Sequence, residues 1–136
     1  MKKKYVFLAL AAIIILSCIS AGARASEYLS SYGAYASAGD TGEITIDFEV
    51  TGNQISDRIG VSKITLYRDN GRMVEAITGS VNNGLISRSD AFHFGSHTFD
   101  HLTPGEYYYA EVTVFAEYNG GSDSRVIETN SVRAPY

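Results

Sequence analysis

The chain has 136 residues, which fits a single domain, and its 11 Lys and Arg against 15 Asp and Glu give a formal net charge of −4. Residues 1–25 hold four of the basic side chains and no acidic one, so residues 26–136 carry 7 basic against 15 acidic side chains, a net charge of −8. Such a surface repels phosphate backbones and anionic lipid headgroups, which argues against nucleic-acid binding and peripheral membrane binding.

The first 25 residues have the three parts of a secretory signal peptide. Three lysines at 2–4 precede an apolar run over 5–19, and Ala23-Arg24-Ala25 ends the segment with small residues at the two positions that a signal peptidase inspects. We therefore predict a signal peptide over 1–25 and one secreted domain over 26–136. A retained membrane anchor is the alternative, because the uncharged stretch is close to the shortest length that spans a bilayer.

Cys18 is the only cysteine of the chain. The run Ile15-Leu16-Ser17-Cys18 resembles the lipobox of bacterial lipoproteins, in which the cysteine thiol receives a diacylglycerol, although that motif prefers a small residue where Leu16 stands. The resemblance implies a second possible location, a lipoprotein anchored through Cys18. Cleavage after Ala25 would instead leave a chain without cysteine, whose stability depends on core packing and not on disulfides.

Short alternating runs broken by turn residues follow, and they indicate an all-β domain. The clearest run is 43–50, in which Ile44, Ile46, Phe48 and Val50 alternate with polar residues, as in an antiparallel strand with one buried face. Turn residues stand at 39–42, 69–71, 82–84 and 119–121. We expect strands over 27–38, 43–50, 63–67, 73–78, 91–99, 107–118 and 124–132. Seven strands in this length predict a seven-stranded antiparallel β-sandwich.

Residues 102–114, which read LTPGEYYYAEVTV, resemble the corner before the sixth strand of fibronectin type III domains. The resemblance implies a fibronectin type III or immunoglobulin-like sandwich, in which Tyr108 lies under the corner and its hydroxyl bonds to the backbone. Pro104 fixes φ at the bend and Gly105 tolerates a tight turn. Fibronectin domains usually carry a tryptophan in the second strand; this chain has none, and Phe48 is the nearest substitute. The predicted core consists of Ile44, Ile46, Phe48, Ile64, Leu66, Leu102, Tyr108, Val112 and Val114.

A second resemblance covers nearly all of residues 26–136. The segments 24–32, 47–52 and 119–125 are similar to a group of small, uncharacterised secreted proteins of clostridia and related Gram-positive bacteria. This resemblance implies an export route and an origin, but no activity.

No enzymatic motif is recognised, and we predict neither a cofactor nor a metal. His93, His97 and His101 are spaced four residues apart, which on a strand separates neighbours by about 13 Å, too far to share a metal ion. There is no Gly-x-Ser-x-Gly elbow, and no cysteine follows residue 25. The alternative is a small secreted hydrolase, glycosidase-like, in which two carboxylates converge in space.

Tyrosine is the unusual component, with nine in residues 26–136. Tyr107, Tyr109 and Phe115 share the strand face opposite Tyr108, so we expect them to point outward and to form a contact face for a glycan or a surface protein. Aromatic residues also favour strands for structural reasons alone. The function that we predict is a secreted, non-enzymatic binding or structural module at or beyond the bacterial cell surface.

The export prediction has a direct test. Protein recovered from the culture medium should begin at Ser26, because the Ala-x-Ala site follows a charged region and a short apolar core. Its intact mass would identify the first residue. A diacylated species that starts at Cys18, or full-length protein retained in membranes, would contradict the prediction.

Overall fold

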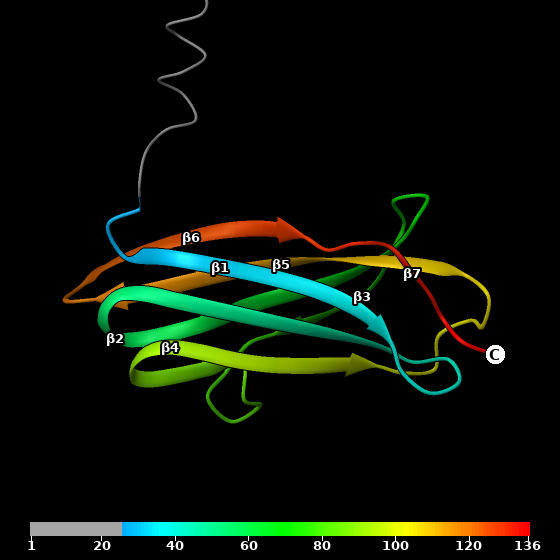
Figure 1. The fold of residues 1–136 in the computed structure, drawn as a ribbon, viewed down its shortest axis with the longest axis horizontal. Coiled ribbons are helices and arrows are strands. Elements are labelled where there is room, and N and C mark those ends of the chain that lie inside the picture. The colour runs from blue at the N-terminus through cyan, green and yellow to red at the C-terminus, as the bar shows by residue number, and fades with distance from the viewer. Residues whose placement is uncertain (1–25) are drawn as a thin grey trace, which may run out of the picture.

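The computed structural model describes residues 26–136, so the predicted signal peptide, its cleavage site and the Cys18 lipobox lie outside the described residues. The described part is all-β, with seven antiparallel strands in one hydrogen-bonded sheet (Figure 1). The strands are β1 (Leu29–Ala38), β2 (Ile44–Arg68), β3 (Met73–Thr78), β4 (Ile86–Phe99), β5 (Tyr107–Tyr118), β6 (Gly121–Glu128) and β7 (Val132–Arg133). Over residues 26–136, no helix is long and apolar enough to cross a membrane.

Strand β2 organises the sheet, because its 25 residues pair with four other strands. Its first part lies between β1 and β4, so that Phe48 is opposite Ala34 on one side and Gly95 on the other. Its second part lies between β3 and β5, with Leu66 opposite Glu75 and Ala110. The strand order continues from β5 to β6, and β7 pairs with the beginning of β5. The sheet is thereby divided into a β1–β2–β4 region and a β3–β2–β5–β6 region that share β2.

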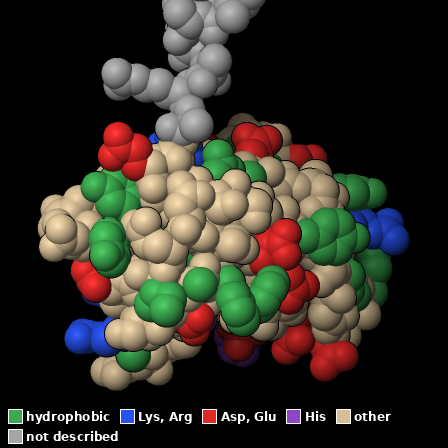
Figure 2. Space-filling view, turned by 60° about the vertical axis from the view of Figure 1, so that its left-hand side comes forward, with side chains coloured by type: hydrophobic (Ala, Val, Ile, Leu, Met, Phe, Trp, Pro, Cys, Tyr) green, Lys and Arg blue, Asp and Glu red, His purple; other side chains and the backbone are tan. Residues whose placement is uncertain are grey.

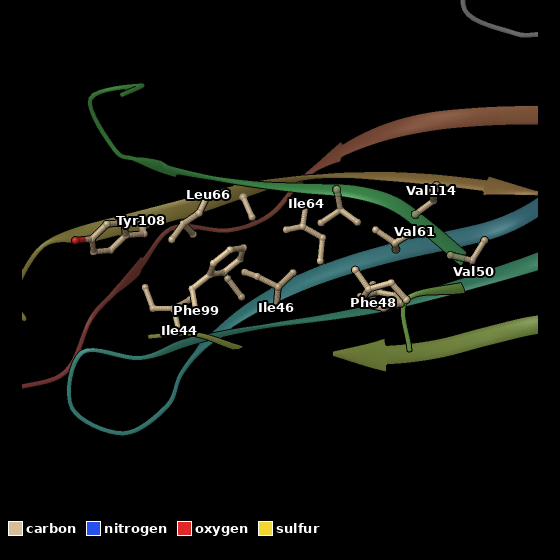
Figure 3. Packing of buried hydrophobic residues seen from close by; sticks show 14 of the residues in the cluster. Ile44, Ile46, Phe48, Val50, Val61, Ile64, Leu66, Phe99, Tyr108 and Val114 are labelled. Atoms are coloured by element: carbon tan, nitrogen blue, oxygen red, sulfur yellow. The ribbon is translucent and has the colours of Figure 1, made fainter. Parts of the chain in front are cut away.

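The two regions enclose the hydrophobic core. Figure 3 shows Ile46 and Phe48 from the first part of β2 pointing toward Ile64 and Val61 from its second part. All nine residues predicted for the core are buried, each 7% exposed or less. Alternation explains this result for the eight that lie in β2 and β5, because every second side chain of a strand points to the same face. Leu102 is buried in the connection between β4 and β5.

Two strand predictions match the observed bounds, those over 73–78 and 107–118. The predicted strands 43–50 and 63–67 are wrong as separate elements, since both belong to β2. The clear alternation of residues 43–50 and that of 63–67 were interpreted as two elements. The backbone nevertheless continues as a strand, because Ser56 is buried and residues 58–60 pair with both β4 and β5.

The predicted last strand over 124–132 is divided into β6 and β7, and Thr129 is the reason. Its N–H donates to the carbonyl of Ala110, while its side-chain hydroxyl accepts a hydrogen bond from the N–H of Ala110 at 2.9 Å. A side chain thus takes the place of the backbone carbonyl that would continue the ladder, and regular pairing with β5 stops there.

Asn130 then covers part of the edge of β1. Its side-chain amide accepts a hydrogen bond from the N–H of Ala36 and donates one to the carbonyl of Ala36, both at 2.9 Å. The amide offers the same donor and acceptor as a strand residue. It therefore blocks a backbone position to which another chain could pair.

The corner around Tyr108 has the predicted hydrogen bond. Tyr108 is 1% exposed, and its hydroxyl accepts a hydrogen bond from the N–H of Thr103 at 3.1 Å. Gly105 has a positive φ of 88°, and a Cβ there would lie 2.3 Å from the hydroxyl of Tyr136. The positive φ favours glycine at this turn, and a larger residue would also displace the exposed Tyr136 side chain.

The corner can be tested with three matched substitutions. Tyr108→Phe should lower the free energy of unfolding by about 1–3 kcal/mol, because the ring remains while the N–H of Thr103 loses its partner. Tyr107→Phe and Tyr109→Phe should cost far less, since these two side chains are not buried. Denaturant midpoints would measure all three variants, and equal losses would show that the hydrogen bond of Tyr108 has no special role.

Candidate functional site

The aromatic face predicted on β5 is only partly exposed. Tyr107 is 46% exposed, and Tyr109 is half-buried against Tyr67 of β2, with ring centroids 5.4 Å apart and an angle of 16° between the rings. The Tyr67 hydroxyl donates a hydrogen bond to Glu111 at 3.4 Å. Partial burial and then the negative charge of Glu111 raise the pKa of Tyr67. These tyrosines form a stacked pair and one exposed ring.

Phe115 does not belong to an exposed face, which corrects the prediction. It has the expected parity, but it is only 7% exposed. The guanidinium of Arg58 lies 5.5 Å from the centre of its ring, and Glu117 holds Arg58 in an ion pair at 3.3 Å. Parity assigns a side chain to a face, but it does not show whether a long neighbouring side chain covers that face.

A different surface has the shape of a binding site. It is an open groove of about 540 Å³ on the β1–β2–β4 region. Tyr35 of β1, Asp47 and Glu49 of β2 and Phe94 of β4 contribute their side chains to it, and it is also lined by Gly33, Ala34, Phe48 and Gly95. We call it the Tyr35–Phe94 groove.

Strand register brings these side chains together. One cross-strand row contains Tyr35, Asp47 and Ser96, and the next row of the same parity contains Gly33, Glu49 and Phe94. The neighbours of these positions in β2, Ile46 and Phe48, are buried in the core, so Asp47 and Glu49 face outward. In this part of β2, the inward side chains thus belong to the core and the outward side chains line the groove.

The groove is acidic and aromatic. The Tyr35 and Phe94 rings are 60% and 63% exposed, and the ring of Phe92, 50% exposed, lies 5.2 Å from that of Phe94. Asp47 and Glu49 make no ion pair or side-chain hydrogen bond to any other residue in the part of the chain that the structure describes. No Lys or Arg lines the groove. Figure 2 shows hydrophobic and acidic side chains interspersed on one face of the molecule, with basic side chains at its margins.

The histidines lie in three different surroundings. The ring of His93 stacks on Phe48, and its two nitrogens lie 2.6 Å from the Ser87 hydroxyl and 2.8 Å from the carbonyl of Gly84. His97 is half-buried against Phe99, as its parity predicts, and this burial lowers its pKa. His101 is exposed beside Asp100. Within residues 26–136, no three His, Cys, Asp or Glu side chains are arranged to hold a metal ion.

Asp123 of β6 fixes the beginning of the described chain. Its carboxylate accepts hydrogen bonds from the hydroxyl of Ser26 at 2.5 Å and from the N–H groups of Glu27 and Tyr28. The Ser26 hydroxyl contributes most to lowering the pKa of Asp123, and the two N–H groups lower it further. Asn53 donates to the carbonyls of Ser26 and Glu27. This polar cluster anchors the chain to the sheet and has no chemistry of its own.

No protein-family model and no curated protein matches the sequence. The fold is similar to the crystal structure of a protein described as ApaA from Bordetella pertussis, with a TM-score of 0.50 and 13% identity over 82% of this chain and 98% of that one. The structural genomics target SoR45 has a TM-score of 0.42 at 11% identity, over 83% of this chain and 89% of its own. The first likeness supports the fold alone.

The Asp123 cluster predicts a pH-dependent contribution to stability. Because the folded-state pKa of Asp123 is lowered, the contribution is present above its unfolded pKa of about 3.9 and is lost as pH falls through the lower folded value. Asp123→Asn should therefore lower the unfolding midpoint at neutral pH. The difference from wild type should shrink below about pH 4. Urea titrations across this range would measure it, and a difference independent of pH would contradict the assignment.

Proposed function

We propose that the protein is a secreted, non-enzymatic binding module of the fibronectin type III or immunoglobulin-like sandwich class, which acts at or beyond the bacterial cell surface. The observation that carries this proposal is the Tyr35–Phe94 groove. Exposed aromatic rings on a rigid sheet provide contact area at a low cost in conformational entropy. The two carboxylates between them provide hydrogen-bond acceptors with no partner among residues 26–136.

Strand order supports the sandwich class. Strands β1, β2 and β4 pair on one side of the core, and β3, β2, β5 and β6 pair on the other. The buried tyrosine at the corner before β5, whose hydroxyl bonds back to the backbone of Thr103, is a feature of this class.

The proposed location rests on the first 25 residues, whose charge and hydropathy pattern is that of a signal peptide. A net charge of −8 on residues 26–136 suits a soluble protein outside the cell and disfavours binding to anionic membranes. A lipid anchor on Cys18 would place the same module on the outer side of the membrane. The resemblance to small secreted proteins of clostridia accords with either location.

A hydrolase remains the alternative, and one observation favours it. Asp47 and Glu49 are two residues apart on one strand face, with Cα atoms about 7 Å apart, and both line the groove. A glycosidase needs one carboxyl group that stays protonated near neutral pH, which requires burial in an apolar site. Both carboxylates here are exposed in an open groove, so binding fits the geometry better than hydrolysis.

Tyr107 and Tyr109 offer a second surface, on the β3–β2–β5–β6 region. Tyr107 is exposed, and the stacked pair of Tyr109 and Tyr67 lies on the same strand face. Phe115 is excluded from this surface by its burial. The Tyr35–Phe94 groove has the better shape for a ligand, so we rank the tyrosine surface second and use it as the control.

The proposal is tested by binding of the mature protein from culture medium to a panel of immobilised polysaccharides and extracellular proteins. The double variant Tyr35→Ser, Phe94→Ser should lose the binding that wild type shows. Tyr107→Ser should retain it, and both should keep the wild-type unfolding midpoint, since exposed positions tolerate such changes. Loss with Tyr107→Ser alone, or no binding by wild type, would contradict the proposed site. Release of reducing sugar by wild type but not by Glu49→Gln would favour the hydrolase.

A further inference from the structure

We propose that the Tyr35–Phe94 groove binds an uncharged oligosaccharide. This inference rests on the proposed binding function of the groove and specifies its ligand class. The argument uses the positions of the two rings, the space at Gly33 and the chemistry of the two carboxylates.

The two rings lie at opposite corners of the groove. Tyr35 is on β1 and Phe94 is on β4, which are separated by β2, and their cross-strand rows are two residues apart. Two strand spacings of about 4.8 Å and two residues of about 3.4 Å place their Cα atoms roughly 12 Å apart. Side chains that start this far apart, on either side of β2, both contact a ligand that extends across the strand. A chain of linked rings has this extent.

Gly33 keeps the space beside Glu49 open on the β1 side of the groove. It lies in the same row as Glu49 and Phe94, and a Cβ at this position would be 3.5 Å from the Glu49 carboxylate, an ordinary contact. A larger side chain could therefore be built there without disturbing the sheet, but it would project into the groove. The absence of a side chain lets a ligand approach the backbone of β1 beside Glu49, across β2 from Phe94.

Asp47 and Glu49 determine which hydrogen-bonding groups a ligand of the groove must have. Ionised carboxylates only accept hydrogen bonds, so the ligand must supply several donors as well as apolar faces for the rings. A sugar chain has both, because its hydroxyl groups lie around the ring edges and its C–H groups form the faces. No basic side chain lines the groove, so carboxylated, sulfated or phosphorylated sugars would be repelled.

A Lys-rich peptide would also be attracted by the two carboxylates. Both are exposed, however, and ion pairs between exposed groups contribute little to affinity. The contact area lies instead in the three aromatic rings, Tyr35, Phe92 and Phe94, which are each at least half exposed. The groove therefore favours a ligand with repeated flat apolar faces over one with repeated positive charges.

The ligand class is tested by isothermal titration calorimetry of the mature protein with four probes: cellohexaose, chitohexaose, an oligogalacturonate and an oligolysine peptide. We expect binding of at least one of the two neutral hexasaccharides, with an affinity that changes little with ionic strength, and no binding of the oligogalacturonate. Tyr35→Ala and Phe94→Ala should each weaken binding by about tenfold or more, equivalent to a loss of ~1.4 kcal/mol.

Gly33→Leu should abolish sugar binding by filling the groove, with an unfolding midpoint close to that of wild type, and Tyr107→Ala should bind as wild type does. Sugar binding that survives Gly33→Leu would overturn the assignment of the site. Binding of oligolysine alone, weakening as salt is added, would leave a binding groove but overturn the ligand class. The absence of binding to both neutral probes would likewise overturn the proposed ligand class.

Discussion

The fold depends on one constraint, the continuity of β2 through both sides of the core. Apolar residues alternate in each part of this strand, so each part presents a buried face, and the two faces meet across the core (Figure 3). Every other strand except β6 and β7 pairs with β2 directly. The core fixes which side chains of β2 point inward, so it also fixes the outward direction of Asp47 and Glu49. These two residues lie at the centre of the groove, and their positions are therefore set by the same strand.

Periodicity accounts for what could be predicted from the sequence. It identified the all-β class, the nine core residues and the bounds of β3 and β5, because alternation and Asn-Gly turns are local signals. The hydrogen bond of Tyr108 was predicted from the resemblance of residues 102–114 to the corner of fibronectin type III domains, and the structure contains it. The continuity of β2 was missed, because the alternating runs 43–50 and 63–67 are separate in the sequence. The pairing of residues 58–60 with both β4 and β5, which joins them, depends on strand register.

The groove was missed for another reason, since it depends on register between strands. Tyr35 and Phe94 are far apart in the sequence and line one groove only because Gly33 and Phe94 are both opposite Glu49. Alternation predicts that Asp47 and Glu49 point outward. It does not predict which aromatic residues of the neighbouring strands lie beside them. For Phe115 the sequence predicted the correct strand face but the wrong exposure. The alternation pattern does not show that Arg58, held by Glu117, covers its ring.

The central claim, that the β1–β2–β4 face is where the protein binds, is tested most directly by two-dimensional amide NMR of the labelled mature protein during titration with a neutral hexasaccharide. The account predicts that the amide shifts change at residues 33–35, 47–49 and 94–96, which are adjacent only through the strand register. Shift changes centred on residues 107–109 would contradict it, as would a spectrum that does not change.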